Sequence, residues 1–195
     1  MITKTSPNQS GVCYPKAIML HHTGGGTFKS NLSWLCNPRS NVSAHYLVGR
    51  GGEVAQLVKH NRRAWHAGIG FGIKRLGIPA NQGNKFCIGI ELVGNGTTPF
   101  TEKQLDKLDW LIQHIHLGEG NLPITDHKEY AGKRKSDMGS NFPLWNYKRY
   151  GQHEKPFTLG RMLKFKDEGE DVRLLNKRLG LASASRFSVH TRSAV

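Results

Sequence analysis

The amphipathic stretch PFTEKQLDKLDWLIQHIHLGEG, residues 99–120, is the feature that most constrains the fold. Its apolar side chains recur at the spacing of one helical face: Leu105, Leu108, Ile112 and Ile115. Thr101 is expected to cap the helix, Gln104 to complete a capping box, and Phe100 to pack against the first apolar residue of the face. Gly118 is expected to end the helix. A helix with one apolar face must cover another apolar surface, so the chain needs a partner layer.

Short apolar runs on both sides of this helix predict the strands of one sheet. Residues 17–20 (AIML) and 86–94 (FCIGIELVG) are each expected to form a strand, and residues 44–58 a hairpin that turns at Gly51 and Gly52. Another short apolar run, LPIT, follows the helix. Strands, a long helix and a further strand favour an α/β or α+β arrangement around a single sheet.

The length of the chain, 195 residues, allows one core of ordinary size and a small appendage. The polar stretch GQHEKPFTLG is typical of a linker. After it, Val172, Leu175 and Leu179 recur at helical spacing. The expected organisation is a main domain, a linker and a small helical segment, over residues 1–150, 151–160 and 161–195.

The charge of the chain indicates an anionic partner. Its 28 Lys and Arg residues against 14 Asp and Glu residues give a formal net charge of +14. Charge alone would also suit nucleic acid, but the sequence has no helix with a regular basic stripe and no interleaving of basic and aromatic residues. Anionic cell-wall or envelope polymers fit the charge equally well, and nucleic acid is kept only as the alternative that charge alone suggests.

Targeting and redox features are those of a protein made in the cytoplasm. No run approaches the roughly 18 apolar residues of a membrane span, and the N-terminal stretch lacks an apolar core of signal-peptide length. Cys13, Cys36 and Cys87 are an odd number of cysteines without CxxC spacing. We expect free thiols rather than a disulfide framework or a cysteine-only zinc site.

Glu91 interrupts the apolar strand predicted over residues 86–94. It shares a face of that strand with Cys87, Gly89 and Val93. A partly buried carboxylate is costly unless it is paired, hydrogen-bonded or used in chemistry. Glu91 is therefore a candidate functional residue.

Two stretches contain candidate metal ligands. His21 ends an apolar run in the motif MLHHTGG. His127 and Asp137 lie in DHKEYAGKRKSDMG, a predicted loop rich in glycine and charge that also contains Lys135. A catalytic zinc ion commonly takes three His or carboxylate ligands and leaves a fourth position for water. His21, His127 and Asp137 would supply three such ligands; the alternative is that they are ordinary surface residues.

Five motifs occur in the order and approximate spacing of a known family: MLHHTGG, VSAHYLVGRGGEVAQLV, AWHAG, IGIELVG and DHKEYAGKRKSD. Over residues 15–150 the chain resembles the zinc-dependent N-acetylmuramoyl-L-alanine amidases of the second type. This group includes phage endolysins, cytoplasmic amidases that recycle cell-wall fragments, and animal peptidoglycan-recognition proteins. The resemblance implies a mixed α/β fold, with a central mixed β-sheet flanked by helices and a small helical C-terminal extension.

The resemblance also implies one Zn²⁺ ion, held by His21, His127 and Asp137. Neighbouring residues on a strand point to opposite faces, so His22 should serve packing or a hydrogen bond instead. The C-terminal segment, 161–195, resembles an incomplete peptidoglycan-binding domain. Its alternative is an amphipathic helix docked on the main domain.

Further roles follow from the same resemblance. Glu91 matches a catalytic acid/base, and Lys135 matches a catalytic lysine that would stabilise an oxyanion. Trp65, His45 and His66 lie in family motifs near the cleft and are expected to bind substrate. For the two histidines, structural hydrogen bonding is an equal alternative. The implied reaction is hydrolysis of the amide bond between N-acetylmuramic acid and L-alanine in peptidoglycan.

The leading functional hypothesis is a phage or prophage endolysin that acts on polymeric peptidoglycan. Such an enzyme is made in the cytoplasm without a signal peptide and reaches the wall after release by a holin. The alternatives are a cytoplasmic amidase that recycles soluble anhydro-muropeptides and a recognition module that binds peptidoglycan without cutting it. A monomer is expected.

Overall fold

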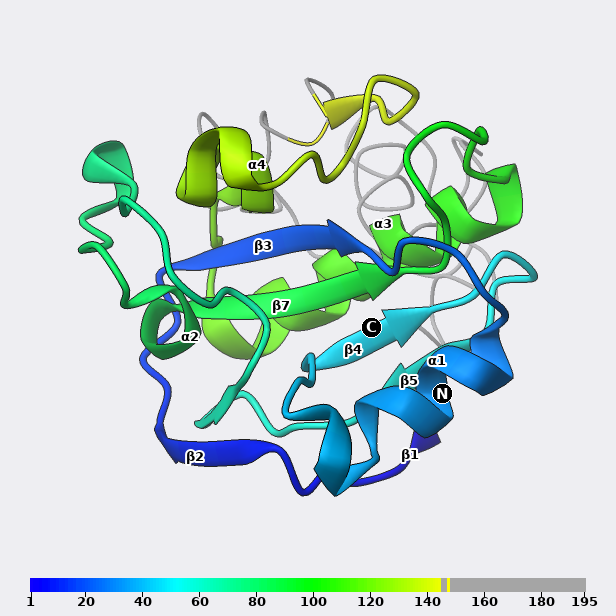
Figure 1. The fold of residues 1–195 in the computed structure, drawn as a ribbon, viewed down its shortest axis with the longest axis horizontal. Coiled ribbons are helices and arrows are strands. Elements are labelled where there is room, and N and C mark those ends of the chain that lie inside the picture. Colours follow the sequence, from blue (N-terminus) through cyan, green and yellow to red (C-terminus); the bar gives the residue numbers. More distant parts are fainter. Residues whose placement is uncertain (145–146, 148–195) are drawn as a thin grey trace, which may run out of the picture.

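The computed structural model describes residues 1–144 and 147. The predicted linker, 151–160, and the predicted helical segment, 161–195, lie outside the described residues. The described part contains a six-stranded sheet, a two-stranded sheet, and helices on both faces of the larger sheet (Figure 1). This is the mixed α/β architecture that the sequence predicts.

The larger sheet mixes parallel and antiparallel pairs. Its strands follow the order β1-β5-β4-β7-β3-β8, with bounds Ile2–Thr3, Val54–Gln56, Tyr46–Val48, Cys87–Leu92, Ala17–His22 and Ile124–Asp126. Strand β7 runs parallel to β3 and β4, and β8 runs parallel to β3. The antiparallel β4–β5 pair confirms the predicted hairpin. Because β3, β7 and β8 are parallel, their carboxyl ends meet at one edge of the sheet, where α/β proteins commonly place their sites.

The smaller sheet was not predicted. It pairs β2 (Gln9–Val12) with β6 (Arg62–Ala64) in antiparallel orientation. Their sequences, QSGV and RRA, are short and carry no alternation of apolar and polar residues. The pairing therefore depends on contacts between distant segments, which a local pattern does not reveal.

Helix α3 (Glu102–Glu119) covers one face of the sheet, as its apolar stripe predicts. Thr101 accepts a hydrogen bond from the Gln104 backbone N–H at 3.2 Å. The expected capping box is wrong in its second half, because the Gln104 side chain instead donates to the Val48 and Val93 carbonyls at 3.1 and 3.0 Å. These bonds join the first turn of the helix to the sheet.

The end of α3 also differs from the expectation. Gly118 lies inside the helix, which continues to Glu119 and ends at Gly120. Gly120 has a positive φ of 79°, a conformation that glycine adopts without steric cost, and its N–H donates to the His116 carbonyl at 3.0 Å. Two glycines so close in sequence gave no local signal to separate them.

The opposite face of the sheet is covered by shorter elements. They comprise α1 (Phe28–Leu35), α2 (Gly83–Phe86), α4 (His127–Ala131) and the 3₁₀ turns Pro38–Ser40, Lys74–Leu76 and Gly132–Arg134. Leu35 of α1 joins one buried cluster with Leu47 of β4, and Tyr130 of α4 joins another with Met19 of β3. This face also carries the candidate site.

Two further expectations concern the cysteines and the membrane. Cys13, Cys36 and Cys87 are all free thiols, as predicted. Burial raises the pKa of Cys13 to about 12, so this thiol stays protonated and unreactive at neutral pH. Within residues 1–144 and 147, no helix has the length and apolar character needed to cross a membrane.

Candidate active site

His21, His127 and Asp137 converge at the carboxyl edge of the sheet. His21 lies near the end of β3, and His127 begins α4 directly after β8. The Nδ1 atoms of the two histidines lie 2.9 Å apart, and Asp137 Oδ2 lies 3.1 Å from His127 Nδ1 and 3.4 Å from His21 Nδ1. All three residues are buried, and together they form a group able to hold a metal ion.

The sheet register explains this convergence. Leu20 of β3 pairs with Asp126 of β8, so the residues that follow them in the chain, His21 and His127, lie at the same edge of the sheet. His127 is not in a loop as predicted but is the first residue of a short helix, because Asp126 caps α4 by accepting the Glu129 N–H at 2.6 Å. The cap fixes the direction in which the helix, and with it His127, leaves the strand.

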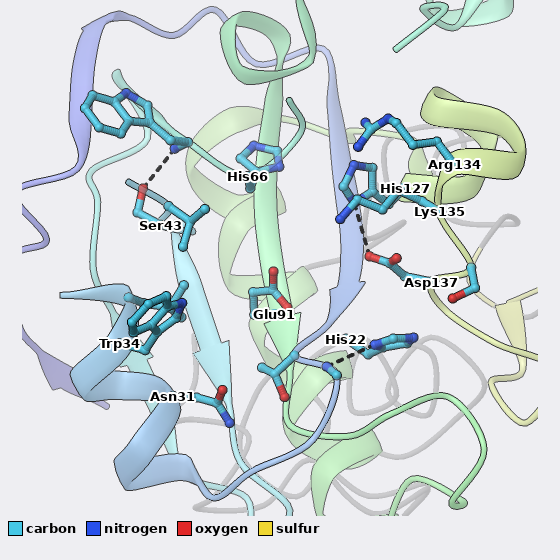
Figure 2. A pocket seen from close by; sticks show the side chains of 16 residues that line it. His22, Asn31, Trp34, Ser43, His66, Glu91, His127, Arg134, Lys135 and Asp137 are labelled. Atoms are coloured by element: carbon cyan, nitrogen blue, oxygen red, sulfur yellow. Dashed lines mark hydrogen bonds and ion pairs between the residues drawn. The ribbon is translucent and has the colours of Figure 1, made fainter. Parts of the chain in front are cut away.

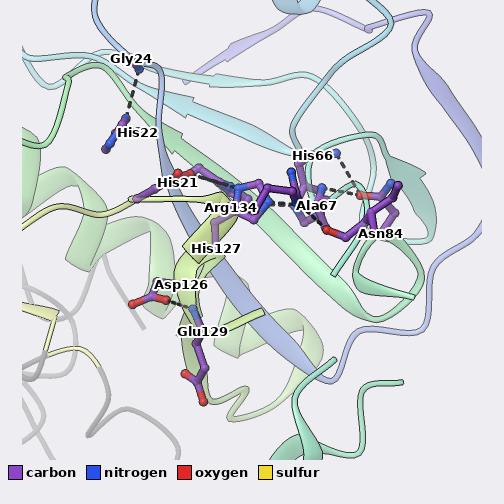
Figure 3. A network of polar contacts seen from close by, with 12 residues as sticks. His21, His22, Gly24, His66, Ala67, Asn84, Asp126, His127, Glu129 and Arg134 are labelled. Atoms are coloured by element: carbon purple, nitrogen blue, oxygen red, sulfur yellow. Dashed lines mark hydrogen bonds and ion pairs between the residues drawn. The ribbon is translucent and has the colours of Figure 1, made fainter. Parts of the chain in front are cut away.

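The outer ring nitrogens determine the tautomers of the two histidines (Figure 3). His127 Nε2 lies 2.9 Å from the Ala67 carbonyl, which can only accept a hydrogen bond, so Nε2 carries the proton. His66 Nε2 likewise faces the Cys87 carbonyl at 3.2 Å and leaves its Nδ1 free to accept from His21 Nε2 at 2.9 Å. The Nδ1 atoms of His21 and His127 are then both acceptors.

Three acceptor atoms therefore face one another without a donor between them. Burial lowers the pKa of His21 to about 4, so its ring is neutral at neutral pH. Burial also raises the pKa of Asp137, but the neighbouring His127 and His21 rings outweigh it, and the net shift is downward. Two imidazole nitrogens and one carboxylate oxygen are a donor set suited to a divalent cation, so the residues present fit a metal ion.

Glu91 lies beside this group, on the same face of the sheet. It pairs in register with His21 across the β3–β7 ladder. In Figure 2 it lies on β7, with Trp34 on one side and Asp137 on the other. Within the described part of the chain its buried Oε2 atom has no hydrogen-bond partner. Burial, reinforced by the negative charge of Asp137 and opposed by Lys135, raises the pKa of Glu91 to about 8. This carboxyl can therefore release or hold a proton near neutral pH.

Two basic residues follow α4 on one wall of the cleft. Arg134 donates to the Ala67 carbonyl at 3.3 Å and also to the Ile69 carbonyl, so its guanidinium is held against that wall. Lys135 lines the cleft near Asp137, and its charge lowers the pKa of both His21 and Glu91. Lys135 thus places a positive charge close to the candidate metal group.

The cleft has a volume of about 390 Å³ and two chemically different walls. Arg134 and Lys135 belong to one wall, whereas Trp34 belongs to the other, across β7 (Figure 2). Trp65 also lines the cleft. Trp34, on α1, is 54% exposed. Trp34 is not among the residues that the sequence predicts to bind substrate; a local signal close to it is the capping box of Thr27 and Ser30, which marks the start of α1.

The predicted substrate-binding residues do not all reach the cleft. Trp65 and His66 line it, whereas His45 has no exposed surface. The His45 ring accepts the Gly89 N–H at 2.9 Å through Nδ1, and its Nε2 lies 3.0 Å from the Arg62 carbonyl. Its contacts correspond to the structural alternative.

His22 lines the cleft but is not part of the metal group. Its Nδ1 accepts the Gly24 N–H at 3.2 Å, a hydrogen bond of the kind expected for the second histidine of the pair.

A scan against family models matches residues 12–140 to the family described as N-acetylmuramoyl-L-alanine amidase. The chain belongs to this family. A curated relative, the 1,6-anhydro-N-acetylmuramyl-L-alanine amidase AmpD of Enterobacter cloacae, is 39% identical over 114 residues. That match covers 56% of this chain and 55% of the relative, so the chain spans about half the length of the curated relative it matches.

Solved structures show the same fold. A selenomethionine derivative of AmpD matches with a TM-score of 0.63 and 25% identity, over 75% of this chain and 91% of that one. A mutant endolysin from Bacillus subtilis matches with a TM-score of 0.54 and 30% identity, over 68% and 86%. The curated relatives named for anhydro-muropeptides favour the recycling alternative over the endolysin hypothesis, although endolysins are among the structural neighbours.

Proposed function

We propose that this protein is a zinc-dependent N-acetylmuramoyl-L-alanine amidase acting on soluble anhydro-muropeptides, with its catalytic domain in residues 1–150. One observation carries the proposal: three buried acceptor atoms of His21, His127 and Asp137 converge beside Glu91, whose carboxyl titrates near neutral pH. A set of two nitrogen ligands and one oxygen ligand is typical of catalytic zinc. Bound there, zinc would supply Lewis-acid activation of the scissile carbonyl and of a water molecule.

The residues of the chain would divide the remaining chemistry between them. Glu91 would take a proton from the attacking water and deliver it to the departing amine of L-alanine, because its pKa of about 8 suits transfer in both directions. Lys135 would stabilise the negative charge that develops on the carbonyl oxygen.

The choice of substrate rests on the relatives and on the cleft. Several curated relatives are named for 1,6-anhydro-N-acetylmuramyl-L-alanine, a substrate whose sugar carries a 1,6-anhydro ring. We infer that Arg134 and Lys135 attract the carboxylates of the stem peptide. Trp34 and Trp65 would provide a flat apolar surface for the sugar.

Polymeric peptidoglycan is the second candidate substrate. It is favoured by the likeness to an endolysin and by the net charge of +14, which suits an anionic wall. In that case the protein has to reach the wall, by the holin-dependent release that an endolysin uses.

The deciding experiment compares the two substrates. The purified protein is incubated with anhydro-muropeptide and, separately, with sacculi, and new L-alanine amino termini are measured before and after chelation and zinc addition. We expect chelator-sensitive release from the fragments, restored by zinc. Release from sacculi alone would favour the endolysin hypothesis, and zinc binding without release from either would indicate a recognition module.

A further inference from the structure

The AWHAG segment contacts both candidate metal-binding histidines. We propose that His66 is a positioning residue that fixes the ring orientation and tautomer of His21, with the glycine at position 89 clearing the space it needs. This inference rests on the proposed metal site. His66 was expected to contact substrate; here it is proposed to orient a metal ligand instead. Gly89 is proposed to leave the space that the His66 ring occupies.

His66 supplies the acceptor that His21 needs. The side chain of His21 is completely buried, and within the described residues its Nε2 contacts His66 Nδ1 at 2.9 Å. The two rings meet edge to face, with centroids 4.9 Å apart and planes at 79°. Without this acceptor, a buried Nε2–H would be unsatisfied, and the tautomer with its proton on Nδ1 would compete. That proton would occupy the atom that binds the metal.

His66 is itself held at both ends. Its Nε2 faces the Cys87 carbonyl at 3.2 Å, and its backbone N–H donates to Asn84 Oδ1 at 2.9 Å. The Ala67 N–H donates to the same Asn84 oxygen at 2.7 Å, and the Ala67 carbonyl accepts from His127 (Figure 3). One short segment therefore orients His21 through a side chain and His127 through the backbone.

Gly89 of β7 lies directly under the His66 ring. A Cβ added at Gly89 would lie 2.5 Å from His66 Cγ and 2.6 Å from His66 Nδ1. These distances are shorter than any ordinary contact, so a side chain at this position would displace the ring. Gly89 has an ordinary negative φ, so backbone conformation does not account for glycine here. The space that the His66 ring occupies accounts for glycine at position 89.

The experiment measures zinc affinity in three variants at position 66, by competition with a chromophoric chelator. His66→Ala removes the acceptor and should weaken binding by about 10- to 100-fold, the usual cost of losing a partner behind a metal ligand. His66→Asn places an amide oxygen where Nδ1 lies and should regain most of the loss. His66→Gln is the matched control, because its amide reaches the position of Nε2 and leaves His21 without an acceptor.

A spectroscopic readout separates positioning from general damage. Cobalt(II) is loaded in place of zinc, and its visible absorption reports the ligand geometry. We expect His66→Ala and His66→Gln to alter the spectrum and His66→Asn to preserve it. Circular dichroism and thermal unfolding in chelator check that each variant is folded, which the backbone contacts to Asn84 favour.

The Gly89→Ala variant tests the proposed link between Gly89 and His66 independently. In the otherwise unchanged protein it should weaken zinc binding, because the new methyl group displaces the His66 ring. In the His66→Ala background the ring is absent, so the same change should cost little further affinity. Additive losses would contradict the proposed link between the two residues.

The outcomes distinguish this inference from the proposed function. A folded His66→Ala protein with unchanged zinc affinity and cobalt spectrum would overturn the inference while leaving the amidase proposal intact. Equal losses in His66→Ala and His66→Asn would overturn the acceptor role. A native protein that binds no zinc would instead overturn the proposed function.

Discussion

The two faces of the central sheet differ in the side chains they carry: the face under α3 is an apolar core, and the opposite face carries the buried polar groups of the candidate site. The face under α3 buries Ile88, Ile90 and Leu92 of β7 against the helix. The Gln104 amide nitrogen donates to two backbone carbonyls there, whereas the Gln104 amide oxygen has no hydrogen-bond partner within the described residues. The opposite face of the same strand carries Glu91, with a buried oxygen that has no partner within the described residues. One face is an apolar core that stabilises the fold, and the other carries the candidate metal group and the cleft.

This difference follows from the alternation of side chains along a strand. Odd-numbered and even-numbered residues of β7 face opposite sides, so a single six-residue strand contributes to the core and to the site. Mutations on the two faces should therefore separate stability from chemistry. The predictions below test that separation.

The largest effect is expected for His127→Ala. Removing one of three ligands should abolish detectable hydrolysis and lower zinc content, because the two remaining ligands bind the ion much more weakly. Activity on anhydro-muropeptide and zinc content of the dialysed protein are the measurements. Hydrolysis retained by a zinc-free His127→Ala protein would show that the site works in another way.

Glu91→Gln should separate the metal from the proton transfer. The amide keeps the size of the side chain but cannot exchange a proton, so the rate should fall by about 10²- to 10⁴-fold, the usual contribution of a general acid or base. Zinc affinity should stay close to that of the native protein. Parallel kinetics and zinc titration check this, and a normal rate would exclude Glu91 from proton transfer.

How much of this arrangement could be predicted from sequence depends on how far apart in the chain the interacting residues lie. The local spacing of apolar residues predicts the apolar face of α3, the hairpin and the strand that carries Glu91, and the structure confirms all three. The convergence of His21 with His127 was expected from family motifs, since residues 106 positions apart share no local pattern. Helix α1 was not predicted; it has only eight residues, of which Leu35 alone is buried, so its local pattern is short.

The role of His66 was beyond sequence reasoning for a different reason. A histidine in the motif AWHAG gives no indication of which group its ring will contact, and the substrate and the structural interpretation were equally open. The decisive contacts, to His21 and to Gly89, come from three separate strands and loops. Only the assembled sheet shows that a missing side chain at position 89 makes room for the ring.

On the helix-covered face, Ile112→Ala should act on stability alone. Ile112 is fully buried in the cluster between α3 and the sheet. Its truncation should lower the free energy of unfolding by about 2–5 kcal/mol, from lost burial and the cavity left behind. Zinc affinity of the folded variant should not change. Urea unfolding and zinc titration test both halves, and a large loss of affinity would show that the two faces are coupled.

The smallest effect is expected in the pH dependence of stability, measured on metal-free protein. The folded state holds the Glu91 proton up to a pKa of about 8, whereas the unfolded state releases it near the ordinary value of 4.5. Between these values the unfolded state binds fewer protons, so the contribution of Glu91 to stability, present at acid pH, is lost as the pH rises.

Glu91→Gln removes this dependence. Relative to the native protein, the variant should therefore gain stability with increasing pH, by up to about 1.4 kcal/mol over one pH unit near neutrality. Urea unfolding in chelator at several pH values measures the gap. A gap independent of pH would mean that Glu91 titrates normally, and the polar face would then be better hydrated than its burial indicates.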